Sequence, residues 1–577
     1  MKTIIFVFCF LFTFMQISAQ NKYFEKRYAF SSHNNNGLEI FSYNDTFKIA
    51  GQLKKKDSNN NVVWQAQVIN SDDYGNILNS KEYYHIYEGA LTTDFFVLDM
   101  CTASNNQYAI SGRLETHAFQ AEYHYDAYLM LVNEECDSTA FYTYRYNDNN
   151  TSSWGMCQSL DEEYFILAGK ARVNNQSVPW LLKVNELGET QWEHIYAVEN
   201  ENSTWFKTVA PALDGGYYVA GITNYYAQNT SLSDILVTKV DSEGNETARK
   251  TIDFGFFDSV GKLVIAQDGS IVITTFDNAD PFTNDYGVGK LLKLDADLNT
   301  ILWDLDVFSD ATVQSVVELA DGDFVVCGSH TFPNGMVDLA IAKVSSDGEL
   351  LWRRTYGGSW SDYAYDLTES PDGGFALIGR SDSTVVDTAY LYFVKTNCMG
   401  LLTEPQASFE EMAIQNGIYQ FNNTSQYVYA DSLDGGHFIW DFGDGTPPVT
   451  INNSGSPQHS YAFSGHYTVS VTAVVCNDTS FFQKSIPVLV TGFEEGNVFG
   501  SNFELYPNPA QNNLAINAKL TKDFQVRIYN NLGKMLYENS HYQTATDIDI
   551  SHFSAGIYFV EIKAKEAVFL EKIVVLK

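Results

Sequence analysis

Asp214-Gly-Gly-Tyr-Tyr-Val-Ala-Gly221 is the clearest copy of a segment that recurs between residues 20 and 400. Asp321-Gly-Asp-Phe-Val-Val-Cys-Gly328 and Asp372-Gly-Gly-Phe-Ala-Leu-Ile-Gly379 are close relatives. Weaker copies are Thr46–Gly51, Gln107–Gly112, Tyr164–Gly169 and Gly269–Thr274. The seven copies end at positions 51, 112, 169, 221, 274, 328 and 379, which are 51 to 61 residues apart. A period of this length indicates a repeat architecture in which each unit packs on the next.

Each copy is followed by an apolar stretch and a turn, as in residues 338–348, and then by a strand with aromatic residues, as in 349–356. Four short strands per unit, repeated seven times, are typical of a β-propeller. Residues 338–379 resemble the repeats of seven-bladed propellers in secreted bacterial proteins. We therefore expect an all-β protein with a seven-bladed β-propeller over residues 20–400, and an open solenoid is the alternative.

The seventh unit ends at residues 389–398 and lacks its fourth strand. Near the N-terminus, Lys22-Tyr-Phe-Glu-Lys-Arg-Tyr28 is similar to Leu351-Trp-Arg-Arg-Thr-Tyr356, a fourth strand of another unit. We expect a strand within residues 22–30 to pair into the seventh unit and close the ring. Closure would remove the unpaired edges that an open stack of sheets exposes.

A second module follows the repeats. Trp440-Asp-Phe-Gly-Asp-Gly-Thr446 and the segment 459–471 carry a resemblance to the PKD domain over residues 405–490, which implies an immunoglobulin-like β-sandwich. Trp440 is expected in its core. Asp441 and Asp444 fit turn stabilisation, with a calcium site as the alternative.

The last module follows a linker at residues 491–501. It begins with Phe503-Glu-Leu-Tyr-Pro-Asn-Pro-Ala510, includes Gly556-Ile-Tyr558 and ends at Lys572-Ile-Val-Val-Leu-Lys577. Residues 502–577 resemble the type A C-terminal sorting domain of the type IX secretion system, which implies a small β-sandwich. The resemblance implies the secretion machinery as partner and a final place at the outer-membrane surface or outside the cell. The matching positions are Tyr506, Pro507, Asn508, Pro509, Gly556, Tyr558 and Lys572.

Residues 1–19 agree with export. Lys2 precedes an apolar run, residues 4–15, and then Ile17-Ser-Ala19, a small-residue cleavage site. This pattern is typical of a secretory signal peptide, because the run is too short to cross a ~30 Å hydrocarbon core. We expect no transmembrane segment in the mature chain.

Composition narrows the choice of partner. The 577 residues include 35 basic and 71 acidic side chains, a formal charge of −36, and this excess argues against nucleic acid and anionic lipid. Seven cysteines are sparse and lack a Cys-x-x-Cys spacing, so one or two disulfides are expected without a definable pairing, and Cys327 is expected to be a buried thiol.

Functional residues are expected on one face of the propeller. The turns between the first and second and between the third and fourth strands of the units are uniform, whereas the loops on the other face vary in length, as function-bearing loops do. Aromatic residues fall on that variable face or at the mouths of the innermost strands. They could stack on a sugar or grip a peptide, and interblade packing is the more ordinary role. The candidate ligand-binding residues are Phe96, Trp154, Trp205, Tyr225, Tyr226, Phe282, Tyr286 and Tyr363.

The chain contains no His-Glu-x-x-His, Gly-x-Ser-x-Gly or phosphate-binding loop motif, so we assign no catalytic residue, metal or cofactor. The sequence favours a non-catalytic surface or released adhesion protein that binds a glycan or a protein. The alternatives are a propeller glycosidase or polysaccharide lyase with an accessory PKD module, and a structural spacer. A deep channel with two or three carboxylates and a base would favour the enzyme, and a shallow aromatic face would favour the binder.

Overall fold

The computed structural model describes most of the chain. The described ranges are 22–30, 34–43, 45–56, 61–84, 92–104, 106–117, 123–196, 203–223, 233–255, 257–277, 287–383, 388–428, 436–453, 456–490, 503–519, 523–541, 544–564 and 567–577. The predicted signal peptide lies outside them. Over these residues every regular element is a β-strand, and no helix is long and apolar enough to cross a membrane.

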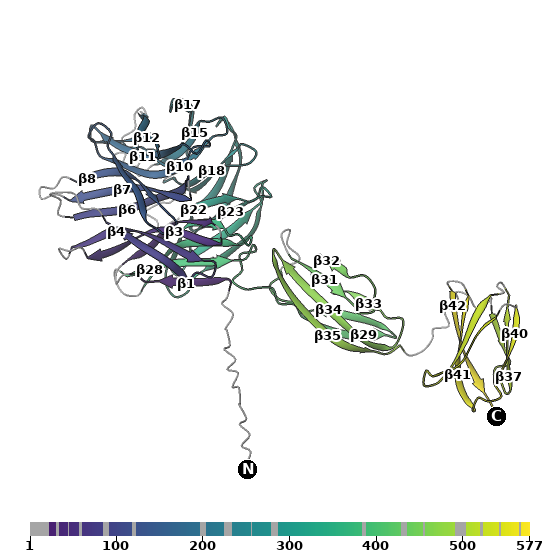
Figure 1. The fold of residues 1–577 in the computed structure, drawn as a ribbon. Coiled ribbons are helices and arrows are strands. Elements are labelled where there is room, and N and C mark those ends of the chain that lie inside the picture. Colours follow the sequence, from purple (N-terminus) through teal and green to yellow (C-terminus); the bar gives the residue numbers. More distant parts are fainter. Residues whose placement is uncertain are drawn as a thin grey trace, which may run out of the picture. The chain divides into compact units, whose positions relative to one another are not determined.

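Before residue 400, the described residues form seven four-stranded antiparallel sheets, which are the blades of a β-propeller (Figure 1). In blades one to six, the strands follow one another from the innermost to the outermost. Blades one to three contain β2 Asn35–Tyr43, β3 Thr46–Lys56, β4 Val62–Asp72 and β5 Ile77–Tyr83; β6 Thr92–Ala103, β7 Gln107–His117, β8 Tyr123–Val132 and β9 Ser138–Tyr144; and β10 Thr151–Gln158, β11 Tyr164–Val173, β12 Gln176–Asn185 and β13 Thr190–Ile195.

The next three blades repeat this order. They contain β14 Trp205–Pro211, β15 Tyr217–Thr223, β16 Asp234–Val240 and β17 Glu246–Ile252; β18 Ser259–Ile265, β19 Ile271–Asp277, β20 Val288–Leu294 and β21 Ile301–Ser309; and β22 Ala311–Glu318, β23 Phe324–Thr331, β24 Val337–Val344 and β25 Leu350–Tyr356. The hydrophobic core lies mainly between neighbouring blades. One cluster, for example, joins Ala66 and Val68 of blade one to Phe95 and Tyr128 of blade two.

Blade seven consists of β26 Asp362–Glu369, β27 Phe375–Asp382 and β28 Ala389–Thr396, and its outermost strand is β1 Phe24–Tyr28. Strand β1 is antiparallel to β28, and Phe24 lies opposite Lys395. The N-terminal strand thus supplies the fourth strand that the seventh repeat lacks, so the two ends of the propeller meet in one sheet.

The repeated sequence has two structural roles. In the turn after the innermost strand, Gly215 has φ +88°, a conformation that side-chained residues resist, and Asp214 Oδ1 accepts a hydrogen bond from Gly216 N at 3.1 Å. The innermost strand carries a β-bulge in every blade, and in six of them the glycine that closes the repeat lies against this strand, whereas Thr274 takes its place in blade five. A Cβ on Gly328 would lie 1.8 Å from Thr312 O.

The chain after the propeller forms two further pairs of sheets. The first pair, β29-β30-β33 and β32-β31-β34-β35, is the PKD sandwich. Its strands are β29 Phe409–Gln415, β30 Ile418–Asn423, β31 His437–Asp441, β32 Val449–Ile451, β33 Gln458–Ser460, β34 Gly465–Val475 and β35 Asp478–Val488. Trp440 is fully buried there, as predicted.

The second pair, β36-β37-β40 and β39-β38-β41-β42, forms the C-terminal domain. Its strands are β36 Phe503–Tyr506, β37 Asn513–Ala518, β38 Phe524–Asn530, β39 Met535–His541, β40 Ala545–Asp549, β41 Gly556–Ala564 and β42 Ala567–Val575. The buried side chains of this domain form one cluster that includes Ile516, Val526 and Val560.

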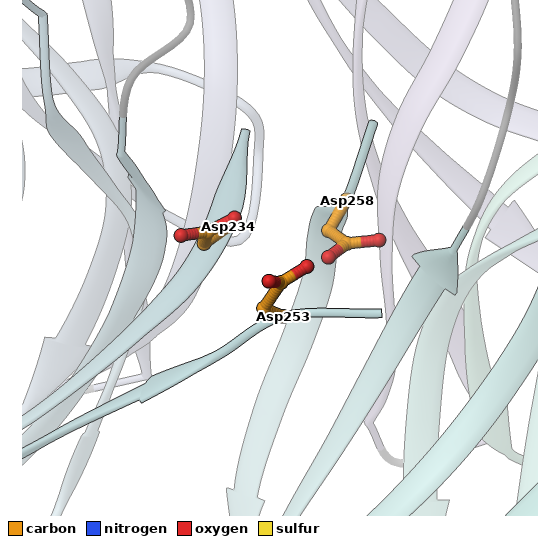
Figure 2. Close-up of side chains that lie close together, drawn as sticks. All are labelled: Asp234, Asp253 and Asp258. Atoms are coloured by element: carbon orange, nitrogen blue, oxygen red, sulfur yellow. The ribbon is translucent and has the colours of Figure 1, made fainter. Parts of the chain in front are cut away.

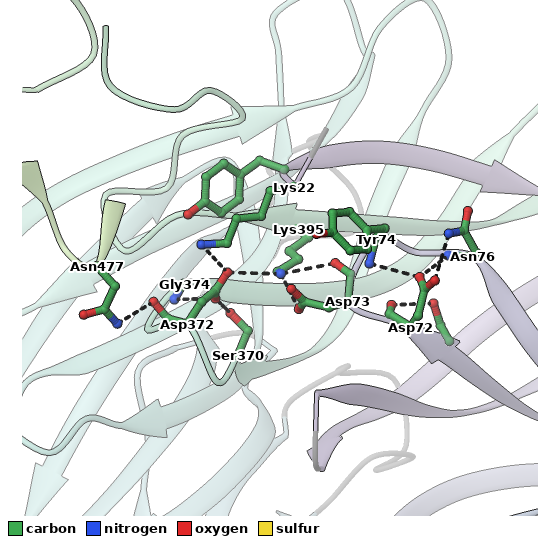
Figure 3. Close-up of polar contacts among 12 residues, drawn as sticks. Lys22, Asp72, Asp73, Tyr74, Asn76, Ser370, Asp372, Gly374, Lys395 and Asn477 are labelled. Atoms are coloured by element: carbon green, nitrogen blue, oxygen red, sulfur yellow. Dashed lines mark hydrogen bonds and ion pairs between the residues drawn. The ribbon is translucent and has the colours of Figure 1, made fainter. Parts of the chain in front are cut away.

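A buried polar network lies where blade seven meets the loop between β34 and β35 (Figure 3). Lys395 is fully buried and its ammonium contacts the carboxylates of Asp73 and Asp372, the latter at 3.1 Å. Lys22 reaches Asp372 at 3.1 Å and Asp478 at 2.9 Å, so the same network includes the segment just before β1.

A disulfide joins Cys398 to Cys476 at the same place. The other described cysteines are free thiols, and Cys327 is fully buried, in agreement with the sequence prediction.

Candidate functional site

A cavity of about 500 Å³ opens on the face of the propeller that carries the loops of variable length. It lies between blades two, three and four, toward the ends of β7 and β11 and the starts of β8, β10 and β12. The lining is polar, and Tyr125 is the one aromatic side chain that the described part of the chain contributes to it. The lining residues are Arg113, Tyr125, Asn150, Ser152, Lys170, Arg172, Asn175, Gln176, Ser177 and Ser203.

Three cations line this cavity in a chain with a formal charge of −36. Arg113 has one carboxylate neighbour, Glu115, at 3.3 Å, while its buried Nε has no hydrogen-bond acceptor in the described structure. Lys170 has no carboxylate within ion-pair distance among the described residues. Burial, together with the charges of Arg113 and Arg172, lowers the pKa of Lys170 to about 8.

Three of the predicted aromatic residues lie beneath these cations. The Arg113 guanidinium lies 4.7 Å from the ring centre of Phe96 and 6.0 Å from that of Trp154. The Lys170 ammonium lies 4.9 Å from the ring of Trp205 and 5.9 Å from that of Trp154. The two indole rings are 6.5 Å apart. Trp205 is only 7% exposed, so these rings support the cations from below and do not line the cavity.

The remaining predicted aromatic residues are not part of this arrangement. Tyr363 lies on β26 in blade seven, opposite Arg380, and does not line the cavity. Tyr225, Tyr226, Phe282 and Tyr286 lie outside the described residues.

The basic residues of the cavity were missed because they are far apart in the sequence. Arg113 and Lys170 do share a signal, since each directly follows the glycine that closes its repeat, Gly112 and Gly169. Equivalent positions in neighbouring blades lie on the same face of a propeller, so two basic residues at this position predict a positive patch.

A second cluster crosses the central channel. Lys262 of β18 lies 2.9 Å from Asp366 of β26 and 3.8 Å from Glu39 of β2, so the innermost strands of blades five, seven and one are joined. Asp366 also accepts hydrogen bonds from the Ser315 hydroxyl at 2.6 Å and from Ile40 N at 3.0 Å.

Burial and mutual repulsion alter the ionisation of this channel cluster. Burial and the neighbouring Asp366 raise the pKa of Glu39 well above its ordinary value. Burial also raises the pKa of Asp99, a neighbour on β6, to about 6, although the charge of Lys262 opposes the shift. Burial disfavours the Lys262 ammonium, but Asp366, Glu39 and Asp99 outweigh it and raise the lysine pKa.

A third group, which the sequence analysis also missed, lies in blade four and the loop that leads to blade five. The carboxylates of Asp234, Asp253 and Asp258 lie within 4.8 Å of one another (Figure 2). Burial, together with the charge of Asp253, raises the pKa of Asp234. Carboxylates are the ligands that Ca²⁺ prefers, but Ca²⁺ takes six to eight oxygens, and Asp258 Oδ2 is already used by Phe254 N at 2.7 Å.

In the C-terminal domain, several predicted sorting residues lie close together. Asn508 donates from Nδ2 to Lys572 O at 2.9 Å and accepts at Oδ1 from Val574 N at 2.9 Å. The Tyr506-Pro-Asn-Pro509 segment is therefore held against β42, while Tyr506 itself is 53% exposed. Tyr558, two residues after Gly556, is buried and its hydroxyl donates to Ser554 O.

In the PKD sandwich, the two aspartates stabilise the turn. Asp441 Oδ1 accepts from Gly443 N at 2.9 Å, and Asp444 Oδ1 accepts from Thr446 N at 3.1 Å. Asp444 Oδ2 is also 2.7 Å from His459 Nε2.

Two family models match the chain. The secretion system C-terminal sorting domain matches residues 504–576, and the PKD domain matches residues 406–488. The chain is therefore a cargo of the type IX secretion system, which exports it to the cell surface or the extracellular space. No curated protein matches it in sequence.

Solved structures resemble it only distantly. PorZ, a surface component of the type IX secretion system of Porphyromonas gingivalis, is 9% identical, with 94% of this chain and 70% of PorZ covered and a TM-score of 0.34. A PL25 ulvan lyase is 10% identical, with coverages of 64% and 96% and a TM-score of 0.42. The propeller domain of the Trilobed protease from Pyrococcus furiosus is 12% identical, with coverages of 65% and 99% and a TM-score of 0.34. Likenesses at these scores transfer neither an activity nor a ligand.

Proposed function

We propose that this exported protein is a non-catalytic adhesion protein whose propeller binds an extracellular glycan or protein through its variable loop face. The observation that carries the proposal is the cavity between blades two, three and four. Its volume of about 500 Å³ falls in the range of small-ligand sites, roughly 300–1,000 Å³. Amide and hydroxyl side chains line it, and they can both donate and accept hydrogen bonds.

The test is a binding screen with the purified protein on polysaccharides and glycoproteins, with reducing ends and unsaturated products measured in parallel. Ser177→Trp fills the cavity with a large side chain without a change of charge. Ser242→Trp, at an exposed turn outside the cavity, is the matched control. We expect binding without product release, a loss of at least tenfold in affinity for Ser177→Trp, and no change for Ser242→Trp.

Unchanged binding by a folded Ser177→Trp protein would rule out the cavity as the binding site. An absence of binding on the whole panel would favour the structural spacer.

A second candidate function has its own observation. The channel contains Glu39, Asp99 and Asp366 beside Lys262, the combination of carboxylates and a base that would favour a glycosidase or lyase. However, Lys262 and Asp366 form an ion pair with each other, and Asp366 accepts two further hydrogen bonds. These contacts occupy the Asp366 carboxylate and favour a structural role for the cluster. Product release that disappears in Asp366→Asn, with folding intact, would establish the enzyme instead.

A further inference from the structure

The basic residues of the cavity indicate the charge of its ligand. This inference rests on the proposed function. We propose that the cavity selects an anionic saccharide, whose carboxylate or sulfate group lies between Arg113, Lys170 and Arg172. A guanidinium can donate two hydrogen bonds to two oxygens of a carboxylate or a sulfate group, and an ammonium adds a point charge.

The cations have charge left for a ligand. Glu115 is the only carboxylate that the described structure places within ion-pair distance of the three, and it contacts Arg113 alone. Burying a cation without an anion is unfavourable, and the lowered pKa of Lys170 reports this cost. Burial is the larger cause of this shift, and the charges of Arg113 and Arg172 lower the pKa of Lys170 further, so the three cations lie close enough to repel one another.

The rest of the lining favours a saccharide over an acidic peptide. Asn150, Gln176 and Ser177 present amide and hydroxyl groups that match the hydroxyls of a sugar. Among the residues that the structure describes, the lining has one ring, Tyr125, and no aliphatic side chain that would bind the apolar side chains of a peptide. The aromatic residues Phe96, Trp154 and Trp205 hold the long basic side chains in place by cation–π contacts.

The experiment compares polymers that differ only in charge. The probes are polygalacturonate against its methyl ester, and dextran sulfate against dextran, so that carboxylate and sulfate are tested separately. Lys170→Met removes one cavity charge. Lys183→Met is its matched control, because Lys183 is in the same blade as Lys170 and also lies over two rings, Tyr164 and Tyr217, but does not line the cavity.

We expect at least one anionic polymer to bind tenfold or more tightly than its neutral partner. Lys170→Met should reduce that preference at least fivefold, and Lys183→Met should leave it unchanged. Wild-type affinity should also fall as the pH rises above about 8, where free Lys170 loses its proton, whereas Lys170→Arg should retain its affinity at pH 9.

Equal binding of charged and neutral polymers, abolished by Ser177→Trp, would overturn the charge selectivity and leave the proposed function intact. A preference for polyglutamate over all the saccharides would replace the sugar with an acidic peptide. No binding to any probe would overturn both.

Discussion

Glu39 lies beside the ion pair of Lys262 and Asp366, 3.8 Å from the Lys262 ammonium, so its protonation affects stability. Its folded-state pKa is raised above the ordinary value, and the unfolded chain therefore releases this proton at a lower pH than the folded protein. As the pH rises through this window, the folded state loses stability relative to the unfolded state. This loss of stability from the ionised Glu39 is absent below the pKa of the unfolded chain, near pH 4, and is present at neutral pH.

Glu39→Gln should therefore stabilise the propeller at pH 7, by about 1.4 kcal/mol for each unit of pKa difference, because glutamine mimics the protonated acid. The gain should disappear near pH 4. Urea unfolding at both pH values measures it. Glu82→Gln, in the exposed pair with Lys55, should change stability by less than about 0.5 kcal/mol. A destabilised Glu39→Gln protein at pH 7 would show that the glutamate charge is needed.

At the residue scale, the sequence predicted aromatic side chains but not the cations above them. The sequence predicts that aromatic residues lie at the mouths of the innermost strands, and the fold brings Phe96, Trp154 and Trp205 together there. Arg172 does not occupy a repeat position that is basic in the neighbouring blade, and a lone arginine in a sequence is ordinarily a solvated surface residue. Its proximity to Arg113 results from the packing of blade three on blade two, which the sequence does not show.

At the scale of the element, six of the seven repeats close with a glycine that lies opposite a bulge, and Thr274 takes that place in blade five. In blade six the register shifts between Val313 and Ser315, and Thr312 O approaches Gly328. Gly328→Ala would place a methyl group 1.8 Å from that backbone oxygen, so β22 or β23 must move. Overpacking of this kind costs roughly 1–3 kcal/mol, occasionally more.

We expect the thermal midpoint of Gly328→Ala to fall by several degrees. Gly358→Ala is the control, because a Cβ there meets no atom within 4 Å. Equal midpoints for the two variants would mean that the repeat glycine is not needed for close packing.

The repeat itself was predictable from these glycines, whereas the bulges were not, because one extra residue in a strand leaves the spacing of the repeats unchanged.

In the C-terminal domain, Asn508 connects the segment before β37 to β42. Asn508→Ala removes two hydrogen bonds, each worth about 0.5–1.5 kcal/mol, that hold the turn from Pro507 to Pro509 against β42. We expect less of the Asn508→Ala protein than of the wild type at the cell surface and in the medium, and more of it inside the cell. Quantitative immunoblots of these fractions measure the difference. Asn512→Ala, at an exposed neighbouring position, should be exported normally. Normal export of Asn508→Ala would show that the machinery does not depend on this contact.

For the whole molecule, ring closure depends on β1, a strand separated from its partner by most of the propeller sequence. Phe24 is 7% exposed and packs edge-on against Phe393 at 5.1 Å, in a cluster with Ile40, Phe47 and Ile378. This cluster joins blade seven to blade one, so it holds the two ends of the ring together. Antiparallel pairing with β28 satisfies the edge that blade seven would otherwise expose.

Phe24→Asp would bury a carboxylate in this cluster and remove the ring contacts. Replacing a buried phenylalanine with alanine already costs roughly 3–5 kcal/mol, and a buried charge adds to this. We expect a lower urea midpoint and, in limited proteolysis, early cleavage between β1 and β2, because the detached strand exposes the backbone on both sides. Ala29→Asp, which adds the same charge at an exposed position just beyond β1, should retain the wild-type midpoint and cleavage pattern. If Phe24→Asp unfolds and is cleaved like the wild type, the remaining strands of blade seven close the propeller without β1.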